Sequence, residues 1–185
     1  ASILLIGTGR VAFHLGHALQ RAGHGLVGVA GRHATHTDAL AHDLNTAPFA
    51  LNAPLPAADA LLIAVSDDAI ADVAMNIPMG DAVVIHTSGS AELDRLLPHP
   101  HRAVLWPLIS LSPGEPMDFR EVSLVIDANS TIARARASAI ANSLSNHIHE
   151  LDHARRELVH AAAAISLNIP VFLLARVQAL LGQQG

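Results

Sequence analysis

The feature that most constrains the fold is a glycine-rich turn at the start of the chain. An apolar run, residues 2–6, leads into this turn, and apolar residues at helical spacing begin at Val11. Gly7 would allow a sharp turn, and Gly9 has no Cβ to keep a pyrophosphate away from the backbone. Unpaired N–H groups at a helix start also favour an anion. The pattern predicts the start of a dinucleotide-binding βαβ unit, although a glycine turn can also end a strand for structural reasons alone. The residues expected at the pyrophosphate are Gly7, Thr8, Gly9, Arg10 and Val11.

Composition excludes several classes of protein. The formal net charge is −5 and no basic run occurs, which argues against nucleic acid or an anionic membrane as a partner. The absence of cysteine excludes disulfides and thiolate metal sites, and it is compatible with the cytoplasm, the expected location. All 11 basic residues are arginines, so a lysine Schiff base is impossible. The alanine-rich stretch 158–175 contains His160, Asn168 and Pro170, which predicts a buried or interface helix rather than a membrane span.

The end of the second predicted strand, residues 24–30, indicates which dinucleotide would bind. In NAD-binding units an acidic residue about 20 residues past the glycines accepts hydrogen bonds from the ribose hydroxyls. Here Arg32 follows the strand, and no acidic residue occurs before Asp38. A guanidinium can pair with a 2′-phosphate through two hydrogen bonds. The sequence therefore predicts NADP, while the alternative is a solvated arginine on a loop.

Further apolar runs predict a layered α/β fold. Residues 60–65 and 81–86 have the composition of strands buried on both faces of a parallel sheet. Helical stretches alternate with these strands, so we expect a doubly wound parallel sheet over residues 1–151. Residues 152–185 would begin a helical domain. The other expected strands are an edge strand within 45–54 and strands at 103–106, 121–126 and 147–151. The expected helices are at 37–44, at 69–75 with Ser66 or Asp67 as its cap, and at 129–144 with Ile132 on its apolar side. A last helix is expected at 153–181, capped by Asp152 and kinked at Pro170.

Three predicted strand ends meet at one edge of this sheet, where doubly wound folds bind their ligands. They are the glycine turn, Val65-Ser66-Asp67 and His86-Thr87-Ser88-Gly89. Ser66 and Asp67 are expected at the nicotinamide-side ribose, with Val65 and Thr87 as further cofactor contacts. His86 and Ser88 would lie nearest the chemistry, where they could orient a carbonyl or imine or donate a proton. Alternatively, Thr87 and Ser88 only cap the next helix.

Polar residues on the last predicted helix form a stripe. His160, Ala164 and Asn168 fall four residues apart, on one side of the helix. This stripe would suit a surface that faces a substrate or a second subunit, and a buried His160 bonded to a backbone carbonyl explains the pattern equally well. Although the chain has 13 histidines, His147 and His149 have no acidic or cysteine partner at a recognised spacing. No metal site is predicted.

Several motifs together resemble a known family. They lie at residues 6–12, 64–70, 86–90, 107–108, 117–120 and 158–162, the last leading to Asn168. The chain resembles proteins assigned as NADP-dependent oxidoreductases, in which a Rossmann-like domain precedes a helical domain of unknown function, related to pyrroline-5-carboxylate reductase and 6-phosphogluconate dehydrogenase. The resemblance implies a Rossmann fold, NADP and a dimer through the C-terminal helices, but no particular substrate. Trp106 departs from the family pattern, so no role transfers to it. Family members also carry further helices, so a pocket that those helices complete would here be missing, or a partner chain would supply it.

The combined prediction is an NADP-dependent oxidoreductase that transfers a hydride to or from a small carbonyl or imine compound. The expected catalytic residues are His86, Ser88, His160 and Asn168. A non-catalytic NADP-binding sensor is the alternative. The expected partners are a small-molecule substrate and a second copy of the chain, bound through the C-terminal helix.

Overall fold

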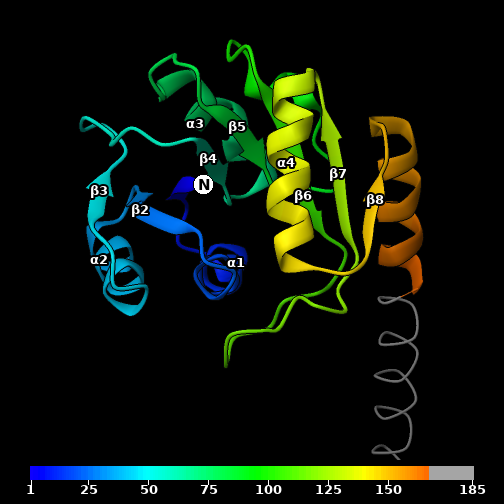
Figure 1. The fold of residues 1–185 in the computed structure, drawn as a ribbon, viewed down its shortest axis with the longest axis horizontal. Coiled ribbons are helices and arrows are strands. Elements are labelled where there is room, and N and C mark those ends of the chain that lie inside the picture. The colour runs from blue at the N-terminus through cyan, green and yellow to red at the C-terminus, as the bar shows by residue number, and fades with distance from the viewer. Residues whose placement is uncertain (167–185) are drawn as a thin grey trace, which may run out of the picture.

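A computed structural model describes residues 1–166 of the chain, and in it the strands form one sheet. The order of the strands across the sheet is β3-β2-β1-β4-β5-β6-β7-β8 (Figure 1). The strands are β1 (Ser2–Ile6), β2 (Gly25–Gly31), β3 (Pro48–Ala50), β4 (Ala60–Ile63), β5 (Val83–His86), β6 (Arg102–Pro107), β7 (Leu124–Ala128) and β8 (Ile148–Glu150). The helices are α1 (Arg10–Arg21), α2 (Ala34–Asp43), α3 (Ile70–Asn76) and α4 (Thr131–Leu144), with short 3₁₀ turns η1 (Asp67–Ala69) and η2 (Leu93–Leu96) and a helix at 153–166.

The predicted doubly wound, Rossmann-like sheet is confirmed, with one departure from a wholly parallel arrangement. The chain passes from β1 to β2 and β3 on one side, and then returns to the other side of β1 to form β4. This reversal places the topological switch point at the carboxyl ends of β1 and β4, where such folds bind ligands. β7 runs antiparallel to β6, because these neighbouring strands are joined by a loop, residues 108–123, and not by a crossover helix.

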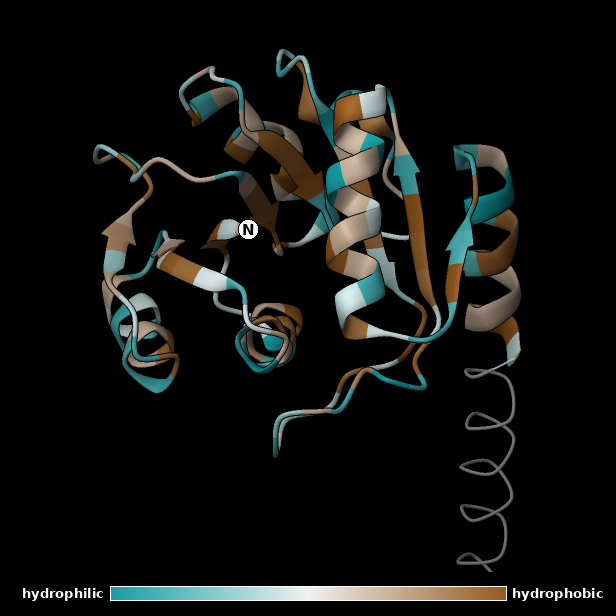
Figure 2. Cartoon of the chain, in the orientation of Figure 1, coloured by the Kyte–Doolittle hydropathy of each residue, from teal (hydrophilic) through white to brown (hydrophobic). Residues whose placement is uncertain are grey.

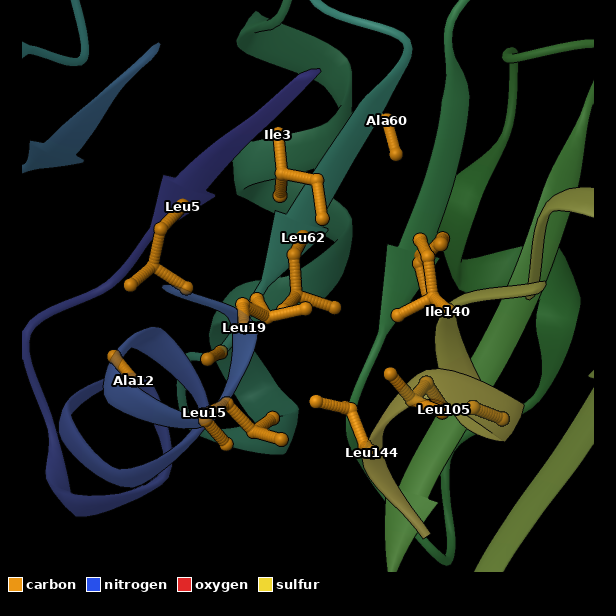
Figure 3. Packing of buried hydrophobic residues seen from close by; sticks show 14 of the residues in the cluster. Ile3, Leu5, Ala12, Leu15, Leu19, Ala60, Leu62, Leu105, Ile140 and Leu144 are labelled. Atoms are coloured by element: carbon orange, nitrogen blue, oxygen red, sulfur yellow. The ribbon is translucent and has the colours of Figure 1, made fainter. Parts of the chain in front are cut away.

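Helices cover both faces of the sheet. On one face α1 and α4 pack side by side, with Leu15 and Leu19 of α1 facing Leu144 of α4 above the strands (Figure 3). The other face is covered by α3 and η2, which bury a second apolar cluster. Figure 2 shows the result in colour, since the inner strands are brown and the edge strand β8 is largely teal. The apolar runs of the sequence thus became the strands at the centre.

α4 differs from its prediction at one position. Its buried residues are Ala133, Ala137, Ile140, Ala141 and Leu144. Ile132 was expected on this apolar side, but it is 57% exposed, so that prediction is wrong. It lies one residue before the stripe that begins at Ala133, and one step rotates a helix position by about 100°.

The C-terminal helix packs on the second face of the sheet, beside β8 (Figure 1). Val159 contacts a cluster formed by Val104, Trp106 and Val125. The predicted cap is confirmed, since the Arg155 N–H donates to Asp152 Oδ1 at 2.9 Å. The predicted extension of this helix to 181, the kink at Pro170 and the site residue Asn168 lie outside the described residues. Within residues 1–166, no helix is both long and apolar enough to span a membrane.

Candidate functional site

A cavity of about 630 Å³ lies at the carboxyl ends of the parallel strands. Every predicted cofactor-binding residue except Asp67 lines it: Gly7, Thr8, Gly9, Arg10, Val11, Arg32, Val65, Ser66 and Thr87. The lining also includes residues that the sequence did not predict, among them Trp106, Pro107, Ile109, Ser110 and Leu111. The switch point therefore brings the three predicted strand ends to one cavity, and the end of β6 adds a fourth wall.

The two glycines of the first turn have different tasks. Gly7 has a φ of 120°, and a Cβ added there would lie 2.2 Å from the carbonyl oxygen of Ala64. Only glycine allows this turn to pass so close to the end of β4. A Cβ on Gly9 would meet no protein atom within 4 Å, and Gly9 lines the cavity. The missing side chain of Gly7 therefore serves the fold, while that of Gly9 leaves open space at the cavity.

The N-terminus of α1 is open to an anion. Gly9 is its N-cap residue and supplies no side chain to cap it. The first intrahelical hydrogen bond runs from the Phe13 N–H to the Gly9 carbonyl, which leaves the N–H groups of Arg10, Val11 and Ala12 without intrahelical acceptors. Together with the positive end of the helix dipole, these groups fit a pyrophosphate.

A loop after β6 closes one side of the cavity. Arg10 donates from Nη1 to the Leu111 carbonyl at 3.2 Å, so its side chain holds this loop. His14, buried in α1, holds it as well, with Nε2 2.9 Å from the Ser112 carbonyl and Nδ1 accepting from the Met117 N–H. Sequence alone gave no signal for this wall, because its contacts with α1 span about a hundred residues.

The β2 end of the cavity is basic. Arg32 and His33 follow Gly31, line the cavity and are exposed. Among residues 1–166, no carboxylate lines the cavity. This donor set fits a 2′-phosphate, which an acidic residue at this position would repel.

The predicted cap after β4 is wrong. Neither η1 nor α3 has a hydrogen bond from a side-chain cap, so Ser66 and Asp67 do not act in that way. The Asp67 carboxylate instead accepts a hydrogen bond from the Ser90 hydroxyl at 2.5 Å. This contact ties the end of β4 to the turn after β5, and Asp67 is not part of the cavity lining.

His86 ends β5, one residue before Thr87, which lines the cavity. Its side chain is fully buried, and Nδ1 accepts from the Ser88 N–H at 3.2 Å. Nε2 has no hydrogen-bond partner among the described residues. Burial lowers the pKa of His86 to about 4, with a smaller contribution in the same direction from Arg156 and an opposing one from Asp67. The ring is therefore neutral near pH 7, and His86 does not line the cavity.

Ser88 is engaged in the turn that follows. Its hydroxyl oxygen accepts from the N–H groups of Ser90 and Ala91, at 3.1 and 2.9 Å. Ser88 is buried and does not line the cavity, whereas Thr87 does. This geometry favours a structural role for Ser88 over a catalytic one, because its hydroxyl stabilises the turn that leads toward η2.

Trp106 connects the cavity to the C-terminal helix. Its ring lies against Gly89, where an added Cβ would be 2.4 Å from a ring atom. The ring centroid is 5.6 Å from that of His160, which is exposed and does not line the cavity. Among the residues that the structure describes, Trp106 links His160 to the cavity. Sequence reasoning missed Trp106, although its place at the end of a strand was a usable signal.

His147 and His149 bond to side chains of the segment before β7. His147 Nε2 lies 3.0 Å from a carboxylate oxygen of Glu121, and His149 Nε2 lies 3.2 Å from the Ser123 hydroxyl. In the part of the chain that the structure describes, no cluster of histidine and acidic side chains could hold a metal ion.

The glycine turn at the switch point of a mostly parallel sheet defines a Rossmann-like protein. A family model described as a Rossmann-like domain matches residues 1–110, and a model described as a domain of unknown function, DUF2520, matches residues 122–185. The chain belongs to the family that joins these two domains.

Solved structures share this fold. A Bacteroides fragilis protein provisionally named an NADP oxidoreductase is 30% identical, with a TM-score of 0.88, and the match covers 99% of this chain and 73% of that one. A Thermotoga maritima protein is 21% identical, with a TM-score of 0.74 and coverage of 97% and 70%. The 1-pyrroline-5-carboxylate reductase of Streptococcus pyogenes is 16% identical, with a TM-score of 0.73 and coverage of 98% and 70%. A comparison with curated proteins found no match.

Proposed function

We propose that this protein is an oxidoreductase that binds NADP and transfers a hydride to or from a small carbonyl or imine compound. The observation that carries the proposal is the cavity itself. It joins the open N-terminus of α1 to Arg32 at the end of β2, without a carboxylate in its described lining. The name of the Bacteroides fragilis relative supports the same activity. The nicotinamide ring, when bound, supplies or accepts the hydride.

Each part of the cavity would hold one part of the cofactor. The N–H groups at the start of α1 would bind the pyrophosphate beside Gly9. Arg32 would bind the 2′-phosphate, with His33 next to it. Val65, Ser66 and Thr87 line the cavity on the β4 and β5 side and would contact the nicotinamide ribose.

The substrate would enter beyond the nicotinamide, at the Trp106 end of the cavity. We propose that His86 and Ser88 do not contact the substrate directly. They hold the turn after β5 in place, and Thr87 at the start of this turn lines the cavity. His160 would border the substrate through its contact with Trp106. Asn168 remains a predicted site residue.

We further propose a homodimer that forms through the C-terminal helix. Leu158 and Ile165 on this helix are 72% and 59% exposed, which suits an apolar contact with a second copy. The division of the chain into residues 1–151 and 152–185 also remains a prediction.

A second function, an NADP-binding sensor without turnover, is favoured by one observation. Neither His86 nor Ser88, the catalytic residues expected at β5, lines the cavity. A turnover assay separates the two functions. NADPH oxidation is followed at 340 nm with a panel of keto acids and cyclic imines, and NADPH binding is measured in parallel by calorimetry. We expect oxidation with at least one class of substrate. Binding without any turnover would favour the sensor.

A further inference from the structure

Arg156 is a buried cation that connects the C-terminal helix to the sheet. Its side chain is fully buried, and its Nη1 lies 2.7 Å from Asp127 Oδ2 on β7. A buried charge of this kind is stable only when its remaining donors are also bonded. Replacing such a pair with apolar residues is often neutral or stabilising, so the pair by itself does not account for an arginine here.

The other donors of Arg156 hold the turn after β5. Nε donates to the Gly89 carbonyl at 3.3 Å, and Nη2 donates to the Ala91 carbonyl at 2.6 Å. Nη2 also lies 3.3 Å from Nδ1 of His153, one turn earlier on the same helix. The planar guanidinium thus fixes two carbonyls and one carboxylate relative to one another, which a point charge such as lysine cannot do.

The turn that Arg156 holds forms one end of the cavity. Thr87, at its start, lines the cavity. Gly89 lies against the ring of Trp106, which lines the cavity as well. His160, one helical turn after Arg156, contacts the other side of this arrangement through the Trp106 ring. Two residues of the C-terminal helix therefore support the same wall.

We propose that Arg156 is a positioning residue for the nicotinamide end of the cavity. It fixes the turn at residues 87–91 and thereby places Thr87 and Trp106, so that the C-terminal helix controls how the nicotinamide half of the cofactor binds. The inference rests on the proposed function, because that function assigns the two ends of the cavity. The adenosine half binds near Arg32, on the other side of β1, and does not depend on Arg156.

The test compares a whole cofactor with its adenosine half. Dissociation constants for NADPH and for 2′,5′-ADP are measured by calorimetry on the full chain and on Arg156→Met, with Arg155→Met as the matched control. Arg155 lies on the same helix, and within residues 1–166 its guanidinium pairs with Asp152 alone, at 4.0 Å. We expect Arg156→Met to weaken NADPH binding at least tenfold and to change 2′,5′-ADP binding less than twofold. Arg155→Met should change neither.

Arg156→Lys covers the case in which the methionine variant does not fold. It keeps the charge beside Asp127 but cannot bond both carbonyls. We therefore expect the affinity for NADPH to fall threefold or more and the affinity for 2′,5′-ADP to stay the same. Unchanged NADPH binding in a folded variant would overturn the inference, as would an equal loss for both ligands. If the unaltered chain binds neither ligand, the proposed function itself has failed.

Discussion

The two ends of the cavity are built in different ways. The end near β1 and β2 consists mainly of backbone, namely the glycine turn and the first N–H groups of α1. One exposed side chain, Arg32, is added to them. At the end near β5 and β6, buried polar side chains fix a turn from several directions, as His86, Ser88 and Arg156 show.

The first end depends on residues that are close in the sequence, and the second depends on contacts between distant segments. The glycine turn follows from residues that are neighbours in the sequence, and each can be altered by itself. The turn after β5 depends on partners far along the chain, since Arg156 reaches it across more than sixty residues. Linked buried groups act as a unit, so a change to one should be felt by the others.

The largest expected effect is at the glycine turn. In Gly7→Ala the new Cβ would lie 2.2 Å from the Ala64 carbonyl oxygen, at a φ that alanine tolerates poorly. We expect a loss of unfolding free energy of about 3 kcal/mol or more, from overpacking and backbone strain together. Urea denaturation measures this loss.

Gly9→Ala is the matched control. Its Cβ meets no protein atom, so stability should change by less than about 1 kcal/mol. NADPH binding should nevertheless weaken, because the Cβ would stand where the pyrophosphate is expected. Equal destabilisation by the two variants would contradict the separate tasks of these glycines.

These contrasts also show what sequence could predict. The strands, the glycine turn and the position of Arg32 came from short patterns, and all three lie where expected. The antiparallel direction of β7 was not predicted, and the capping role of Ser66 and the burial of Ile132 were predicted wrongly. Each depends on contacts that form only when distant segments pack. Arg156 carried no local signal, since an arginine on a helix is usually exposed.

An acid titration tests the β5 end. The pKa of His86 is lowered from 6.5 to about 4, first by desolvation and then by Arg156. Between these pH values the unfolded chain binds a proton that the folded chain does not, so stability falls as the pH falls. The free energy of unfolding has its full value above about pH 6.5, where His86 is neutral in both states. By pH 4 the protonation of His86 in the unfolded chain has lowered it by about 3 kcal/mol.

Urea denaturation at several pH values measures this slope, and His86→Gln removes it. The twelve other histidines remain in the variant, so the difference between the two proteins reports His86 alone. Curves that stay parallel from pH 7 to pH 4 would show that His86 takes up its proton as readily in the folded chain as in the unfolded one.

The change at Arg32 is also the most direct test of the central claim, that the β1–β2 end of the cavity binds NADP. Arg32→Ala removes a charged hydrogen-bonding group worth about 1.5–3 kcal/mol, which corresponds to roughly 10- to 150-fold in affinity. Calorimetry with NADPH and NADH, on this variant and on the control Arg136→Ala, whose half-buried arginine does not line the cavity, gives four dissociation constants. We expect NADPH binding to weaken by that factor in Arg32→Ala alone, with NADH binding unchanged. If Arg32→Ala weakens both cofactors equally, or neither, Arg32 does not bind the 2′-phosphate and the assignment of NADP is contradicted.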